Sequence, residues 1–188
     1  MKKLALLAIF ASTVVFGQTK KVTSSTIQWW GYKLAKTEAS SHTGNLTMKS
    51  GNIVVKGNQL VGGDFVFDMN SINTTDLTGE YKTKLDNHLK NGDFFEVEKF
   101  PTASYKITSV KKNTHKNFKY IISGNLTIKG KTAPVSFLAN ISHNKGVYQI
   151  SSDKFAWDRQ KFGVSYKITM KDVMLKDDID MQIKLTAQ

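Results

Sequence analysis

Alternation of apolar and polar residues is the clearest pattern in this chain. Residues 179–187 and 165–171 alternate without a break, so each segment predicts a strand with one buried and one wet face. Weaker alternation predicts further strands at 65–69, 103–107, 126–129 and 135–141. Turn signals lie between these runs at 50–52, 56–58, 62–64, 129–131 and 144–146. Such spacing favours hairpins, and one-sided alternation predicts an all-β antiparallel barrel with an apolar interior.

One segment breaks this two-residue period. Four residues between Leu77 and Leu89 recur every four positions, the others being Tyr81 and Leu85, and predict one short helix between the early and middle strands. Thr75 or Asp76 is expected to cap its start. Gly92 is expected to end it in the left-handed conformation.

The N-terminus has the layout of a secretory signal peptide. Two lysines, Lys2 and Lys3, precede an apolar run over residues 4–16, which is too short to span a bilayer. Gly17 suits the last position before a cut, so we expect a mature protein that begins at Gln18 and lies in the periplasm. A buried N-terminal helix is the alternative. Residues 18–188 then form one domain, without a cysteine for disulfides, thiolate metal sites or lipid anchoring.

The chain is strongly basic, with a formal net charge of +12. A basic balance can indicate nucleic acid, an anionic membrane surface or an acidic ligand. Arg159 is the only arginine, and arginine is the usual reader of guanine edges and phosphates, so nucleic acid is not expected as a partner. Lysines at every second residue of the expected strands indicate a solvated outer face.

Catalytic and metal-binding signals are sparse. The four histidines lie far apart without metal-ligand spacing, and nucleophile-elbow, phosphate-loop and dinucleotide patterns are missing from the sequence. We therefore expect neither an enzyme nor a bound metal or cofactor. His42 could face a ligand or serve as a hydrogen-bonded structural residue, and the sequence leaves both readings open.

Three blocks carry a resemblance to a known family. They are the double-phenylalanine segment 92–104, the strand and turn at 124–135, and the aromatic segment 157–164. Together with the upstream residues Trp29, Gly31, His42 and Gly44, they resemble the YceI-like family, exported bacterial proteins that hold a lipid inside a lipocalin-like barrel. The resemblance implies about eight strands. It also implies an isoprenoid, isoprenoid quinone or fatty-acyl ligand, and it allows a homodimer.

The barrel interior is where binding is expected. At this strand number an interior can be packed or can hold one small ligand, and the resemblance favours a cavity. Methionine and aromatic side chains adapt to flexible apolar ligands. Phe67, Met170 and Met181 are expected to line the interior space that holds the apolar tail of the lipid. The full set of expected ligand-binding residues is Trp29, Phe65, Phe67, Met69, Tyr105, Phe137, Trp157, Arg159, Phe162, Tyr166, Ile168, Met170 and Met181. Phe94, Phe95 and Phe100 are expected to pack in the core beneath the turn after the helix.

Three classes of function follow. The first is a soluble periplasmic carrier that holds a lipid tail in the barrel, without stable membrane insertion. The second is an enzyme of lipid or quinone metabolism. The third is a small outer-membrane barrel, which the lysines on the outer strand faces disfavour, because such barrels need an apolar outer band.

Overall fold

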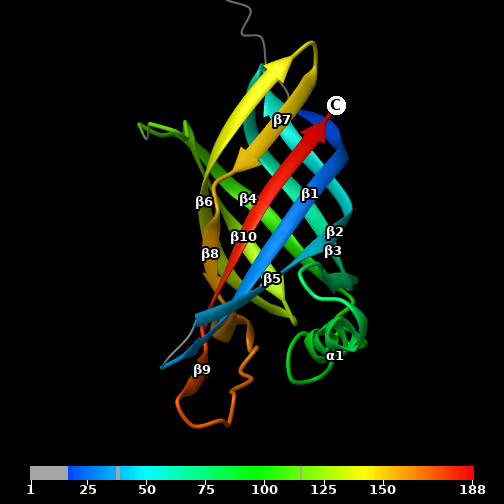
Figure 1. Ribbon diagram of the computed structural model, residues 1–188. Coiled ribbons are helices and arrows are strands. Elements are labelled where there is room, and N and C mark those ends of the chain that lie inside the picture. The colour runs from blue at the N-terminus through cyan, green and yellow to red at the C-terminus, as the bar shows by residue number, and fades with distance from the viewer. Residues whose placement is uncertain (1–16, 37–38, 115) are drawn as a thin grey trace, which may run out of the picture.

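The computed structural model describes residues 17–36, 39–114 and 116–188. The expected signal peptide therefore lies almost wholly outside the described residues. The chain forms a tall antiparallel barrel with one helix at its lower end in Figure 1. No helix among the described residues is long and apolar enough to span a bilayer.

The described elements follow one another around the barrel in chain order. They are β1 (Gln18–Ala35), β2 (Ala39–Lys56), β3 (Gln59–Thr74), α1 (Gly79–Lys90), β4 (Thr102–Lys112), β5 (Tyr120–Ile128), β6 (Lys131–Asn144), β7 (Val147–Ser152), β8 (Phe155–Asp158), the 3-10 turn η1 (Arg159–Phe162), β9 (Val173–Leu175) and β10 (Asp178–Ala187). Each of β1 to β6 pairs with the next strand in the chain, and β3 and β4 pair across α1. The all-β antiparallel prediction is confirmed.

Closure of the wall depends on β10, which is paired along both edges. One edge pairs with β1, from Trp30↔Asp180 to Val22↔Ala187. The other edge pairs with β8 at its start and β7 at its end, so β7 and β8 together occupy one position in the wall. The result is a closed eight-stranded barrel, as expected, with β9 added outside the ring on the lower end of β1.

The strand expected at residues 165–171 is wrong. This segment is an irregular loop between η1 and β9. The strands that it could have joined are already paired, since both edges of β10 are taken and the end of β1 pairs with β9. The alternation of one segment does not show whether the edge of a neighbouring strand is free to pair with it.

Two of the expected turns are also wrong. Residues 50–52 and 62–64 lie inside β2 and β3, which pair directly through Gly51↔Phe65 and Asn52↔Asp64. Glycine is required there by close approach: a Cβ on Gly63 would come within 2.8 Å of the Asn52 carbonyl oxygen. The turns at 56–58, 129–131 and 144–146 are confirmed, with Gly57, Gly130 and Gly146 at positive φ.

The helix exists, but its expected boundaries and apolar stripe need correction. Thr78 occupies the N-cap position without a side-chain cap. Asn91 is the C-cap, and Gly92 just past it has no positive φ, so its expected left-handed conformation is wrong. Tyr81 is 75% exposed, so the buried face is confined to Leu85 and Leu89. Asp76 instead reaches back to β2, which removes it from capping.

The two ends of the barrel differ. At the upper end in Figure 1, Ile53, Val55 and Ala187 are at most 1% exposed and fill the interior. At the lower end, where Figure 1 shows α1 and β9, residues of α1, the segment 91–101 and β9 line an open cavity. The interior is therefore packed at one end and hollow at the other.

Candidate functional site

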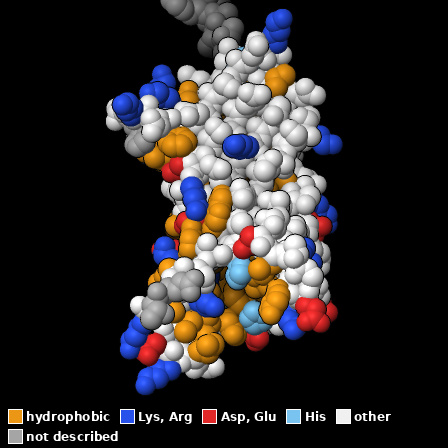
Figure 2. Space-filling model, viewed as in Figure 1, with side chains coloured by type: hydrophobic (Ala, Val, Ile, Leu, Met, Phe, Trp, Pro, Cys, Tyr) orange, Lys and Arg blue, Asp and Glu red, His pale blue; other side chains and the backbone are white. Residues whose placement is uncertain are grey.

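The hollow end contains an apolar cavity, here called the mouth cavity. Its empty volume is about 930 Å³ including the space at its opening. Its walls come from the inward faces of the strands and from α1, which contributes Leu85 and Leu89. Phe94 and Phe95 line it from the segment after the helix. Figure 2 shows hydrophobic side chains gathered around this lower hollow, with histidine side chains beside them.

A second, smaller cavity lies deeper in the barrel and is here called the inner cavity. Its empty volume is about 390 Å³, and Phe65, Tyr105 and Phe137 contribute to its wall. The Tyr105 hydroxyl donates to the Val135 carbonyl at 3.0 Å. Burial raises the pKa of this hydroxyl, so it stays neutral.

The two cavities follow one another along the barrel, and the same strands form the walls of both. On β10, Ile179 and Met181 line the mouth cavity, whereas Ile183 and Leu185 line the inner cavity. This follows from the two-residue period, since every second side chain points inward one step further along the barrel. Phe67 lines both cavities and is 4% exposed. Its ring therefore lies between them.

Aromatic contacts connect the two sides of the opening. The Tyr166 ring from the loop 164–172 lies 4.6 Å from the His88 ring on α1 and 5.3 Å from the Phe94 ring, measured between centroids. His88 also contacts Phe94 edge to face at 5.0 Å. The loop and the helix thus meet beside the mouth cavity.

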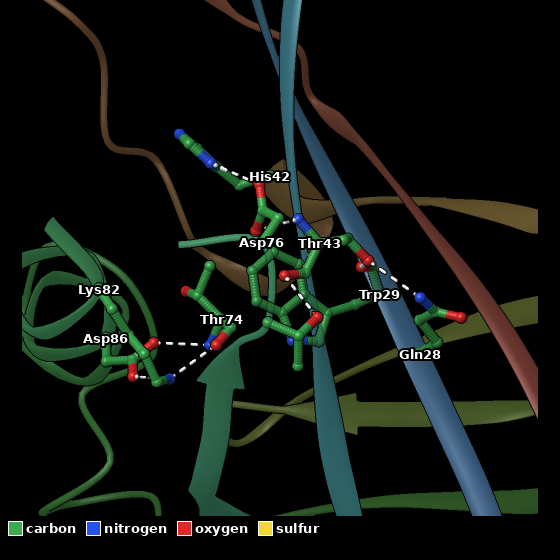
Figure 3. Close-up of polar contacts among 9 residues, drawn as sticks. Gln28, Trp29, His42, Thr43, Thr74, Asp76, Lys82 and Asp86 are labelled. Atoms are coloured by element: carbon green, nitrogen blue, oxygen red, sulfur yellow. Dashed lines mark hydrogen bonds and ion pairs between the residues drawn. The ribbon is translucent and has the colours of Figure 1, made fainter. Parts of the chain in front are cut away.

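Polar contacts on the outside of the opening fix β2, β3 and the segment that leads to the helix (Figure 3). The Asp76 carboxylate accepts from the Thr43 backbone amide at 3.0 Å and contacts His42 Nδ1 at 3.0 Å. The Thr43 hydroxyl in turn donates to the Trp29 carbonyl at 2.8 Å. His42 is hydrogen-bonded, as one of the two interpretations expected, and it also lines the mouth cavity, so a role toward a ligand stays a prediction.

A second carboxylate attaches the helix. Asp86 on α1 accepts from the Thr74 backbone amide at 2.7 Å and from Lys82 Nζ at 2.6 Å. Lys82 also donates to the Thr74 carbonyl. Partial burial raises the pKa of Asp86, but the hydrogen bonds from Lys82 and Thr74 outweigh it, and the pKa lies below its usual value. The pKa of Asp76 is lowered in the same way, with the Thr43 amide and His42 outweighing burial.

Trp29 and Trp157 are the large aromatic residues of the mouth cavity. Trp29 packs directly on Gly44 of β2, where any Cβ would collide with the indole ring and with the Asn73 carbonyl. That contact explains a glycine at this position. Among the described residues, neither indole N–H has a hydrogen-bond partner. Such buried donors are costly when unpaired.

Arg159 is buried but does not line either cavity. It is 2% exposed, and its guanidinium donates to the Val164 carbonyl at 2.6 Å and to the Asp177 carboxylate at 2.8 Å. A further contact reaches the Lys176 carbonyl at 3.4 Å. The planar fork of arginine thereby connects the start of the loop 164–172 to the segment between β9 and β10. Arg159 shapes the loop beside the mouth.

The structure places the expected site residues in three groups. Those that line the mouth cavity are Trp29, Phe67, Met69, Trp157 and Met181; those that line the inner cavity are Phe65, Phe67, Tyr105 and Phe137. Those outside both cavities are Arg159, Phe162, Tyr166, Ile168 and Met170. Met170 is 67% exposed, so the expected inward position of this residue is wrong. It lies in the loop that was expected to be a strand.

Several cavity residues were missed by sequence reasoning. Phe94 and Phe95 were expected in the core; they are buried as expected, but they also face the mouth cavity. The others are Leu46, Ile72, Leu85, Leu89, Leu126, Ile128, Leu175 and Ile179. Four of these, Ile72, Leu126, Ile128 and Ile179, follow the inward phase of strands whose alternation was recognised, so that phase could have identified them.

These features define a class: a small closed antiparallel barrel, packed at one end, with an apolar cavity that opens at the other and can hold one small ligand. Comparison with known protein families identifies the family of this chain. The chain belongs to the family of YceI-like domains, whose family model matches residues 15–187.

Curated relatives include the protein YceI of Escherichia coli, 32% identical over 126 residues, and a UPF0312 protein of Photorhabdus laumondii, 33% identical over 125 residues. The alignments cover 62% of this chain and about 60% of the length of each relative.

Solved structures share the fold. BcnA of Burkholderia cenocepacia matches with a TM-score of 0.65 at 16% identity, covering 87% of this chain and 96% of that chain. A polyisoprenoid-binding domain from Saccharophagus degradans matches with a TM-score of 0.61 at 9% identity, covering 90% and 97%.

Proposed function

We propose that this protein is a periplasmic carrier that holds the apolar tail of an isoprenoid or another long-chain lipid in the mouth cavity. The observation that carries the proposal is the cavity itself, whose wall is almost wholly apolar and which opens beside α1. Burial of apolar surface contributes about 25 cal/mol per Å², so a tail that buries a few hundred Å² gains several kcal/mol without a specific polar contact.

Polar groups near the opening suit a head group that remains in water. Lys33 and His42 both line the mouth cavity, and Lys33 is exposed. An isoprenoid, an isoprenoid quinone and a fatty-acyl lipid all combine a long tail with a small polar end. Chain length and bulk should therefore influence affinity more than the head group does.

The surface supports a barrel that works in water. Inward residues are apolar, while Lys106 on β4 and Lys184 on β10 are exposed on the outer face. An outer-membrane barrel requires the reverse arrangement, and a lysine at the bilayer midplane costs roughly 2–4 kcal/mol. Export through a signal peptide cut before Gln18 remains part of this proposal, and intact mass with cell fractionation tests it.

The experiment that tests the carrier function is native mass spectrometry of protein purified from its own periplasm, followed by organic extraction. The expected result is one bound lipid with a long apolar chain, and the same spectrum reports monomer or homodimer. An empty protein that also takes up no prenyl alcohol from dispersion would contradict the proposal. Incubation of the extracted lipid with the protein should leave it chemically unchanged; turnover would instead favour an enzyme of lipid or quinone metabolism.

A further inference from the structure

One side of the opening carries exposed apolar and basic residues together. We define it as the basic rim, formed by the end of β1, the loop 164–172 and β9. Its exposed apolar side chains are Leu34, Met170 and Met174, which are 37%, 67% and 61% exposed. Leu34 and Met174 pair across β1 and β9, so they share one outward face. Three of the five large hydrophobic side chains exposed among the described residues thus lie here.

The charges of the basic rim are unbalanced. Residues 165–176 contain three lysines and one aspartate. Lys167 and Lys171 are exposed on either side of Met170, and Lys33 and Lys36 extend the positive charge onto the end of β1. Asp172 offsets part of it through an ion pair with Lys36 at 3.0 Å. The helix side of the opening differs: residues 79–101 contain five carboxylates and four lysines, so their charges nearly cancel.

The basic rim is continuous with the mouth cavity. Leu175 lines the cavity while its β9 neighbour Met174 faces outward. On β1, Lys33 lines the opening next to exposed Leu34. A flexible methionine between lysines can enter the boundary between head groups and acyl chains, while the lysines contact anionic head groups.

We propose that the basic rim docks on an anionic lipid bilayer, with the mouth cavity opening toward the head groups. This inference rests on the proposed carrier function, because docking would let a tail pass between bilayer and cavity without crossing open water. An anionic bilayer is the occupant that satisfies both properties of the rim, its apolar side chains and its positive charge. The helix side lacks this excess of positive charge, so the barrel meets the surface on its β9 side.

Vesicle flotation tests the docking. The protein is mixed with phosphatidylcholine vesicles that contain or lack phosphatidylglycerol as one lipid in three. We expect binding to the anionic vesicles that weakens with added salt. Each lysine near an anionic surface changes partition about fivefold, so the Lys167→Glu, Lys171→Glu double variant should bind at least about twentyfold more weakly. The Met170→Ser, Met174→Ser double variant should bind the anionic vesicles several-fold more weakly than the unaltered protein.

Matched controls sit at the other end of the barrel. Lys111 and Lys112, at the exposed end of β4, give the same charge change when both are replaced by glutamate. Val61 on β3 is 44% exposed and serves as the apolar control through Val61→Ser. The controls should bind vesicles as the unaltered protein does. Equal loss in the control and rim variants, or equal binding to neutral and anionic vesicles, would overturn the docking inference.

A second measurement separates docking from carrying. Uptake of geranylgeraniol is measured from a detergent-free dispersion and, separately, from anionic vesicles. Uptake from dispersion without vesicle binding would overturn docking and leave the carrier function intact. Vesicle binding without uptake from either source would overturn the carrier function. Binding to an acidic protein or self-association at the rim, with no vesicle binding, would assign the rim to that partner and reject the bilayer.

Discussion

The position of Phe67 between the two cavities predicts that it limits the length of tail that the barrel accepts. Ile179 and Leu185, the first and last inward residues of β10 that line the cavities, lie six positions apart, or roughly 20 Å at the usual rise of a strand. The mouth cavity occupies the first part of that path and the inner cavity the rest. Phe67→Ala removes the ring between them, so a continuous channel should form.

The expected gain can be estimated from buried tail. Each buried methylene contributes about 0.8 kcal/mol, so a further five-carbon prenyl unit that enters the inner cavity gains roughly 4 kcal/mol before ordering costs. Even a third of that free-energy gain corresponds to an affinity that is about tenfold higher. Truncating a buried phenylalanine also costs about 3–5 kcal/mol of unfolding free energy, so Phe67→Ala should melt at a lower temperature when empty and recover when loaded.

The assay compares farnesol with geranylgeraniol, which differ by one five-carbon unit, by calorimetry or displacement of a fluorescent prenyl analogue. In Phe67→Ala, the affinity ratio between the longer and shorter alcohol should rise at least about tenfold over the unaltered protein. Phe65→Ala is the matched control, since Phe65 is 6% exposed and lines the inner cavity only. If both variants show the same length dependence, Phe67 does not divide the interior and the reasoning fails.

Further predictions concern the mouth and its supports. Met181→Trp should fill the mouth cavity and abolish prenyl uptake with an unchanged circular dichroism spectrum, whereas Met170→Trp should bind normally; equal effects would contradict the assigned positions. Arg159→Lys should lower the melting temperature by about 4–8 °C, since lysine cannot replace the fork and about 2 kcal/mol is lost; an unchanged melting curve would refute this. Because the pKa of Asp86 is lowered by folding, its ionised carboxylate stabilises the fold at pH values above the ordinary pKa of 3.8, and this stabilisation is lost as pH falls through the lowered pKa. Asp86→Asn should therefore be less stable than the parent at pH 7 and equally stable in strong acid. A constant difference across the pH range would show that Asp86 acts without its charge.

Alternation was sufficient to predict most of the barrel, because its physical cause is local. A strand with one wet face must repeat every two residues, and β10 and β3 do so. The same rule placed Phe67 and Met181 correctly inside. It failed for residues 165–171, where the period is equally clean but the partner edges are taken. Strand formation needs a free neighbour, and no pattern within one segment reports that.

The mouth was harder to predict because tertiary contacts define it. Leu85 and Leu89 belong to the expected helix, but nothing in a four-residue period shows which barrel end they cover. The carboxylates of Asp76 and Asp86 bind backbone amides of Thr43 and Thr74. Those pairs are separated by 33 and 12 residues, so local capping rules could not assign them.

The two sides of the opening are supported differently, and this determines where a tail can leave. On the helix side, Lys129 donates to the Phe94 carbonyl at 2.8 Å and lies 3.7 Å from Glu96, while the Val97 amide donates to the Lys90 carbonyl. Hydrogen bonds to helix and turn therefore fix the backbone behind the cavity-facing phenylalanines. On the other side, the loop 164–172 is fastened by Arg159 at its base and contacts the helix through the Tyr166 ring. Aromatic contacts are weaker and less directional than a backbone ladder, so separation of Tyr166 from His88 is the least costly way to widen the opening. The loop that Tyr166 anchors also carries Met170 and Lys171, so the less firmly held side of the opening and the surface proposed to meet the bilayer lie on the same side of the barrel.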